Sequence, residues 1–146
     1  MVRDPAATVL EMGKVTYRNG SRYFACRSGL ECVCLRIGWF KGGHLSDREA
    51  QLEELAELVG GPAQDYMRAM WLSRHDALQI FRAACVTTAL PEPWPRSATG
   101  PWAVAYAVSA NAKGVFDLGA SVDVLGYRPV DDYDAFASTL LGASQL

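Results

Sequence analysis

The sequence predicts an α/β fold in which helices cover a parallel sheet, and three observations carry this prediction. The first is residues 30–40, LECVCLRIGWF, where Val33, Leu35 and Ile37 share one strand face and two cysteines share the other. A strand that is apolar on both faces is typical of parallel sheets covered on both sides. The second is the order helix, glycine, strand over residues 13–40. The third is that helical patterns surround the two extended segments of the chain.

The composition is that of one globular domain with nearly balanced charge. The 146 residues are 50% hydrophobic and 21% charged, with a formal net charge of −2. No run of lysines and arginines suggests nucleic-acid binding. No apolar stretch approaches the roughly 18 residues of a membrane span, and the first residues lack a signal-peptide core. We therefore expect a cytoplasmic protein of one domain, residues 1–146, with no nucleic-acid or membrane partner.

The cysteines predict free thiols. They are Cys26, Cys32, Cys34 and Cys85. They form no CxxC motif, and with only two histidines in the chain no arrangement has the spacing of zinc ligands. We expect buried free thiols in a reducing compartment, and no metal site.

The first part of the chain predicts a helix, a strand and a second helix. The first helix covers residues 13–28, and Gly29 stands where a left-handed cap is needed. The strand follows, with Trp39 at its carboxyl end, where open α/β sheets bind ligands. A capping box, SDRE at residues 46–49, begins the second helix, and the sequence GGP at residues 60–62 ends it.

The second part predicts a further helix, a strand and two more helices. The sequence SRHD at residues 73–76 is again a helix start, because a serine cap is followed by an acid three residues later. The apolar stripe of that helix comprises Leu78, Ile80, Phe81, Ala84 and Cys85. Residues 102–108 alternate as a strand does. Asp117 caps a short helix closed by Gly126, and residues 131–132 begin the last helix.

Two strands with several helices do not complete a sheet core. Either further strands lie in the tail of the chain, or the chain is part of something larger. Five segments in order then give a resemblance: LRIGWF, MWLSRHD, YAVSAN, FDLGAS and LGYRPVDD. Together they resemble the carboxyl-terminal half of extended short-chain dehydrogenases of the NAD-dependent epimerase/dehydratase family, nearest to uronate-dehydrogenase-like sugar oxidoreductases.

The resemblance covers residues 5–136 and implies a partial Rossmann-like, doubly wound fold. The helix and core strand would occupy residues 1–40, and a small substrate-side region residues 41–146. The amino-terminal dinucleotide-binding βαβ unit would be lacking, because neither GxGxxG nor GxxGxxG occurs and no strand precedes the first glycine, Gly13. The family implies NAD or NADP, a sugar or sugar-acid substrate and a homodimer, but the chain alone has no evident way to hold the cofactor tightly.

The chemistry of the family rests on a Tyr-x-x-x-Lys pair on one helix. At that spacing the lysine lies beside the tyrosine and lowers its pKa, so that the phenol can transfer a proton. Counting back from Gly29, the resemblance assigns the lysine to Lys14, as a catalytic and cofactor-binding residue, and the tyrosine to Leu10. Leu10 cannot transfer a proton, and none of the six tyrosines has a lysine four residues later. A lysine facing water is the other interpretation of Lys14.

Four further residues are assigned to a site by the resemblance. Ile37 and Gly38 match the position whose backbone approaches the nicotinamide, and Trp39 would begin the substrate wall. The other interpretation is that Ile37 belongs to the core and Trp39 covers the end of the sheet. Arg68 lies near the position of an arginine for an anionic substrate group, because a guanidinium fork suits a carboxylate or phosphate. A surface arginine is the alternative.

Two functions follow from these residues. The first is the substrate-binding half of an NAD(P)-dependent sugar or sugar-acid oxidoreductase or epimerase, truncated or split and inactive alone. The second is a non-catalytic binding or dimerisation module that kept the scaffold and lost the chemistry. A hydrolase built on Ser73, His75 and Asp76 is set aside, because neighbours on one helical turn point in different directions.

Overall fold

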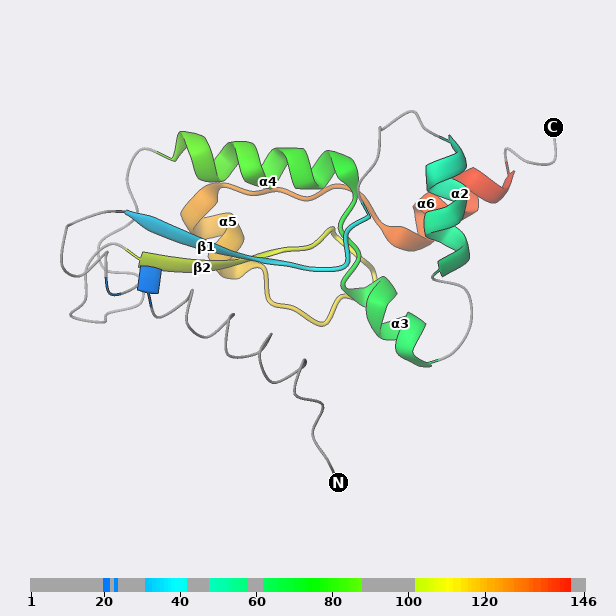
Figure 1. Ribbon diagram of the computed structural model, residues 1–146, viewed down its shortest axis with the longest axis horizontal. Helices are drawn as coiled ribbons and strands as arrows, with labels where there is room; N and C mark the ends of the chain where they lie inside the picture. Colours follow the sequence, from blue (N-terminus) through cyan, green and yellow to red (C-terminus); the bar gives the residue numbers. More distant parts are fainter. Residues whose placement is uncertain are drawn as a thin grey trace, which may run out of the picture. The chain divides into compact units, whose positions relative to one another are not determined.

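The computed structural model describes residues 20–21, 23, 31–41, 48–57, 62–87 and 102–142. In chain order its elements are β1 (Cys32–Ile37), α2 (Arg48–Glu57), α3 (Pro62–Ala69), α4 (Arg74–Val86), β2 (Trp102–Ala107), α5 (Gly119–Leu125) and α6 (Tyr133–Gly142) (Figure 1). The chain divides into two compact units, residues 1–34 with 88–104 and residues 35–87 with 105–146. Of the helix predicted over residues 13–28, residues 20–21 and 23 are described, and they are helical. Among the described residues, no helix combines the length and apolarity needed to cross a membrane.

β1 and β2 are hydrogen-bonded neighbours and run parallel, which confirms the predicted parallel sheet (Figure 1). Just beyond the strands, Trp39 forms a parallel bridge with Trp71, and Leu72 N donates to Trp39 O at 2.8 Å. On the other side of this segment, Ser109 N donates to Trp71 O at 2.9 Å. The backbone around Trp71 therefore lies between the extensions of the two strands.

β1 is less buried than its sequence predicts. Residues 32–35 are half-buried, whereas Arg36 and Ile37 are exposed, Ile37 by 51%. In β2, by contrast, Ala105 and Ala107 are fully buried. The prediction of a strand buried on both faces is wrong for this chain, because the described part of the sheet has two strands and β1 has a strand neighbour on one side only.

α4 begins as predicted, but a different face of it is buried. Ser73 is the extended N-cap, and its Oγ accepts a hydrogen bond from Asp76 N at 2.9 Å. Asp76 is fully buried and accepts backbone N–H groups from residues 130 and 131, which fixes the rotation of the helix. In consequence Ile80 is buried, while Leu78 and Phe81 of the predicted stripe are 63% and 45% exposed.

The last two helices lie close to their predicted places. Asp117 Oδ1 accepts from Gly119 N at 2.8 Å just before α5, and Gly126 closes that helix in the left-handed conformation, with φ 65°. α6 starts one residue after Asp132, whose Oδ1 accepts from Ala135 N at 2.9 Å. The acidic pair at residues 131–132 thus marks the start of this helix, and Asp132 is the member that caps it.

The region after α2 contains a helix that the sequence pattern does not predict. The sequence GGP at residues 60–62 indicates an ending, yet α3 starts at Pro62 itself. Proline suits the first helical position, because its φ is already helical and the missing N–H would have no partner there. One proline therefore both follows one helix and opens the next.

An aromatic core joins α2, α6 and the segment around Trp71 in the second unit. Its buried members are Leu55, Trp71, Tyr133 and Leu140, with Trp39, Met67, Phe136 and Ala137 packed against them. α2 and α6 are in contact (Figure 1). Trp71 stacks on Phe136 with ring centroids 5.0 Å apart, and meets Tyr133 edge-on at 5.9 Å.

The described cysteines are free, as predicted, but they are not deeply buried. Cys32 and Cys34 are half-buried, and Cys85 is exposed on α4. Burial raises the pKa of the Cys32 thiol, and the neighbouring Cys34 adds to the shift. Cys26 lies outside the described residues.

Candidate functional site

The carboxyl end of β1 is closely packed against backbone. A Cβ atom added to Gly38 would lie 2.1 Å from Met70 O and 2.6 Å from Val108 Cγ1. Gly38 N donates to Ala107 O at 2.9 Å, so the strand pairing continues through this position. Glycine is required here because another part of the chain comes too close for any side chain.

The two residues that flank Gly38 have different surroundings. Ile37 is 51% exposed, so the interpretation that it belongs to the core does not hold in this chain. Trp39 is half-buried and packs against the aromatic core. At the end of β1, the apolar side chain of Ile37 is thus exposed, whereas the side chain of Trp39 packs against the aromatic core.

Arg68, in the last turn of α3, is held by its neighbours. Its Cζ lies 5.3 Å from the centroid of the Tyr133 ring, and its Nη1 lies 3.6 Å from Asp65 Oδ1. Burial raises the pKa of Tyr133, and the positive charge of Arg68 partly offsets that shift. The side chain of Arg68 is still 28% exposed. Lys14, the remaining residue of the predicted site, lies outside the described residues.

Asn111 ties the end of β2 to the rest of the second unit. Its Nδ2 donates to Trp71 O at 2.8 Å, and its Oδ1 accepts from Tyr133 N at 3.2 Å. The side chain of Asn111 therefore holds the backbone at Trp71 and the start of α6 together. From the sequence Asn111 is only the polar residue that ends a strand, and nothing in its neighbours along the chain signals this role.

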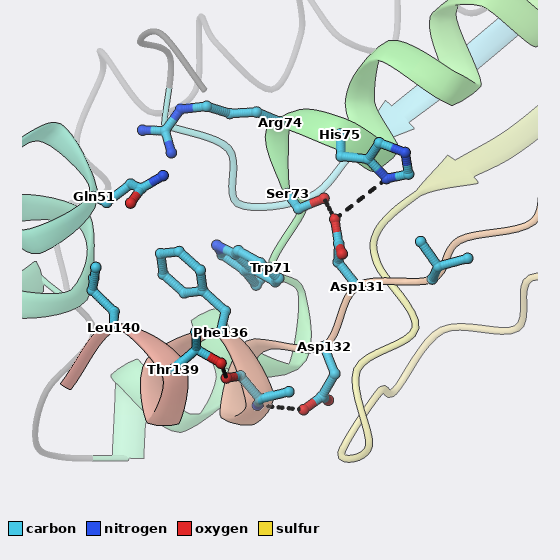
Figure 2. A pocket seen from close by; sticks show the side chains of 12 residues that line it. Gln51, Trp71, Ser73, Arg74, His75, Asp131, Asp132, Phe136, Thr139 and Leu140 are labelled. Atoms are coloured by element: carbon cyan, nitrogen blue, oxygen red, sulfur yellow. Dashed lines mark hydrogen bonds and ion pairs between the residues drawn. The ribbon is translucent and has the colours of Figure 1, made fainter. Parts of the chain in front are cut away.

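A polar network joins the start of α4 to the segment before α6. Ser73 Oγ donates to Asp131 Oδ2 at 2.5 Å, and Asp76 accepts from Val130 N and Asp131 N at 3.1 Å each. The His75 ring is 59% exposed, and its Nδ1 lies 3.5 Å from Asp131 Oδ2 (Figure 2). The same nitrogen lies 3.5 Å from Asp76 Oδ1. The serine hydroxyl thus donates its proton to a carboxylate rather than to the imidazole of His75.

The same carboxylates hold parts of the fold together. His75, Asp76 and Asp131 each offer one possible metal-ligand atom, and these atoms lie within 4.8 Å of one another. However, both oxygens of Asp76 already accept backbone N–H groups, and Asp131 accepts from Ser73. Their negative charge acts on buried Tyr127 as well, whose pKa is raised first by burial and then by these two acids.

Glu54 and Arg74 form a buried ion pair that the sequence does not predict. Arg74 Nη1 lies 3.0 Å from Glu54 Oε2, and the residues are 9% and 1% exposed. The other carboxylate oxygen of Glu54 accepts from Trp71 Nε1 at 2.6 Å. A glutamate within an acidic helix and an arginine in a first helical turn both suggest exposed positions, because charged residues are seldom buried. Only the packing of α2 against the start of α4 reveals the pair.

Comparison with known proteins first defines the class of fold. The chain is similar in structure to uronate dehydrogenase from Agrobacterium tumefaciens, with a TM-score of 0.57 and 20% sequence identity. The match covers 92% of this chain and 40% of that protein. The fold is therefore a Rossmann-like α/β fold, represented here by part of its length, as predicted.

The sequence comparison then gives the relationship. The chain is 35% identical over 111 residues to an L-arabinose 1-dehydrogenase (NAD(P)(+)) of Haloferax volcanii, over 75% of this chain and 37% of that relative. No protein-family model matches the sequence. The chain is thus a relative of the short-chain-dehydrogenase-like NAD-dependent dehydrogenases, which confirms the predicted resemblance, and it spans about two fifths of the length of the proteins it matches.

Proposed function

We propose that this chain is the substrate-side half of an NAD(P)-dependent sugar or sugar-acid oxidoreductase or epimerase. In this proposal the chain forms one domain, works in the cytoplasm as a homodimer, and is inactive without the other half. The observation that carries the proposal is the 35% identity to an NAD(P)-dependent dehydrogenase over 37% of the length of that relative. An enzyme of this class needs a nucleotide-binding half as well, and the sequence here contains no glycine-rich phosphate turn.

In the proposal the carboxyl end of β1 lies next to the bound cofactor and substrate. Ile37 and Gly38 lie beside the nicotinamide, and the exposure of Ile37 supports this, because an apolar side chain there is available to a planar ring. Trp39 and Arg68 contact the substrate, and the guanidinium of Arg68 suits an anionic group. Lys14 is the proposed catalytic and ribose-binding lysine.

In the proposal the described residues contribute only part of a dinucleotide site. The space next to Gly38 is filled by the backbone of Met70 and the side chain of Val108, so this glycine does not provide a phosphate cradle. Leu10 stands where the family has its proton-transferring tyrosine. In the proposal, residues from another segment or polypeptide supply the cofactor site and the acid/base group.

The first test is a titration of the purified chain with NADH, followed by tryptophan fluorescence. We expect no saturable change up to about 1 mM, which corresponds to a binding free energy of about −4 kcal/mol, while circular dichroism shows a folded chain. N-acetyltryptophanamide at equal absorbance controls for absorption by NADH. Saturable binding at lower concentrations would contradict the proposal, since the chain would then have its own nucleotide site.

The second test supplies the other half. The chain is co-expressed with the amino-terminal part of the Haloferax volcanii relative, and reduction of NAD⁺ or NADP⁺ is followed with L-arabinose and with D-galacturonate. We expect reduction only when both parts are present. A stable complex that shows no turnover would instead favour the alternative function, a non-catalytic binding or dimerisation module.

The alternative is a non-catalytic binding or dimerisation module. Two observations favour it: Leu10 in the tyrosine position, and the exposed apolar residues Leu78, Phe81 and Val86 on α4. Light scattering of the chain, compared with that of a Leu78→Gln/Phe81→Gln variant, tests this role. A module that dimerises through α4 becomes monomeric in the variant, whereas an unchanged mass excludes this face.

A further inference from the structure

The second unit contains a pocket of about 550 Å³, large enough for a small molecule (Figure 2). Side chains from α2, α6, the start of α4 and the segments just before α4 and α6 line it, among them Gln51, Trp71, Arg74, Asp131 and Phe136. None of the described residues assigned above to the strand-end site, Ile37 to Trp39 and Arg68, is part of the lining. The pocket is therefore distinct from the proposed reaction site.

Arg74, which lines this pocket, has unused hydrogen-bond donors. Its side chain is nine-tenths buried, and one nitrogen, Nη1, pairs with Glu54. Its Nε and Nη2 are buried and have no hydrogen-bond partner in the described part of the chain. Figure 2 shows this side chain reaching over the pocket towards Gln51. Buried N–H groups without a partner cost about 1–3 kcal/mol each, so an oxygen-bearing ligand would stabilise them after a small side-chain adjustment.

The charges around the pocket favour a neutral ligand. Glu54 pairs with Arg74, and the described lining contains no other arginine and no lysine. Asp131 and Asp132 also line the pocket and add two negative charges. A ligand carboxylate or phosphate would be repelled by these aspartates, whereas hydroxyl groups can accept from Arg74 and donate to Asp131.

The base of the pocket is apolar. Phe136 stacks on Trp71, and Figure 2 shows both rings between Gln51 and Arg74 on one side and Asp131 on the other. Leu140, Val130 and Ala135 add to the apolar lining. A ligand that fits must therefore combine polar groups at its edges with a C–H face that can lie against an aromatic ring.

We propose that this pocket is a second small-molecule site, separate from the reaction site, for a neutral polyhydroxylated molecule of monosaccharide size. Arg74 donates to ring or hydroxyl oxygens, Asp131 accepts from hydroxyl groups on the opposite side, and the C–H face lies on Phe136. The inference does not depend on the proposed function, because it rests on the pocket residues alone.

The test is a titration of the ¹⁵N-labelled chain with D-galactose and with D-galacturonate, the same ring bearing a carboxylate, followed by the indole N–H signal of Trp71. We expect saturable shifts with galactose at a Kd of about 1–10 mM, and binding of galacturonate weaker by at least about threefold. Ala135→Phe fills the pocket from an exposed position on α6 and should weaken galactose binding by at least about tenfold. Its control is Ser138→Phe, on an exposed face outside the lining, which should bind as the wild type does.

Arg74→Lys tests the donors themselves, because it keeps a cation for Glu54 but removes the planar fork, and should weaken binding by at least about threefold. The inference is overturned if the wild type shows no saturable shift, if Ala135→Phe binds galactose unchanged, or if galacturonate binds more tightly. Binding that is lost in Arg68→Gln but retained in Ala135→Phe also overturns it. That last result would locate the sugar at the reaction site and support the proposed function.

Discussion

Replacing Arg74 by methionine removes the cation that pairs with a fully buried carboxylate, that of Glu54. Glu54 is 1% exposed, and without Arg74 its only remaining described hydrogen bond comes from Trp71 Nε1. Breaking a buried pair by removing one partner destabilises proteins by about 3–5 kcal/mol, because an uncompensated charge stays in a low-dielectric site. We expect a loss of this size in the free energy of unfolding, which is a large fraction of the stability of a small protein.

A double-mutant cycle separates the charge from the packing. In Glu54→Gln/Arg74→Met both charges are gone, while the amide oxygen still accepts from Trp71, so the total loss should be only about 1–2 kcal/mol. Urea unfolding followed by tryptophan fluorescence and circular dichroism measures all four proteins at pH 7. If Arg74→Met alone costs less than about 1 kcal/mol, the pair behaves like an exposed salt bridge and the reasoning fails.

Two further predictions concern the end of β1 and the buried phenol. Gly38→Ala should lower the free energy of unfolding by about 1–3 kcal/mol or more, because the new Cβ clashes with Met70 O. Gly142→Ala is the control and should not destabilise the protein, because the space around Gly142 is open. Equal urea midpoints for the two variants would refute the close approach at Gly38. Because burial raises the pKa of Tyr127, the folded state holds the phenol proton more tightly than the unfolded chain does. Stability should therefore fall as the pH rises above about 10, and Tyr127→Phe should reduce that slope in urea unfolding at pH 8 to 11.

Much of the local structure could be predicted because its causes lie close together along the chain. Ser73 caps α4, Gly126 closes α5, and α6 starts at Tyr133, since each depends on residues within one helical turn. The resemblance carried by short segments was sufficient to identify the fold class. α3 was missed because Pro62 indicates the end of one helix and the start of the next equally well.

What the sequence alone determined is the order of the strands and of the helices other than α3, the parallel type of the sheet and the relationship to NAD-dependent dehydrogenases. Only the tertiary structure decided which face of α4 is buried, because the rotation of that helix is set by backbone N–H groups of residues 130 and 131 that reach Asp76 from 54 and 55 residues away. It also decided that Glu54 and Arg74 form a buried pair beside a pocket. Both outcomes depend on contacts between distant segments, and no pattern of neighbouring residues encodes such contacts.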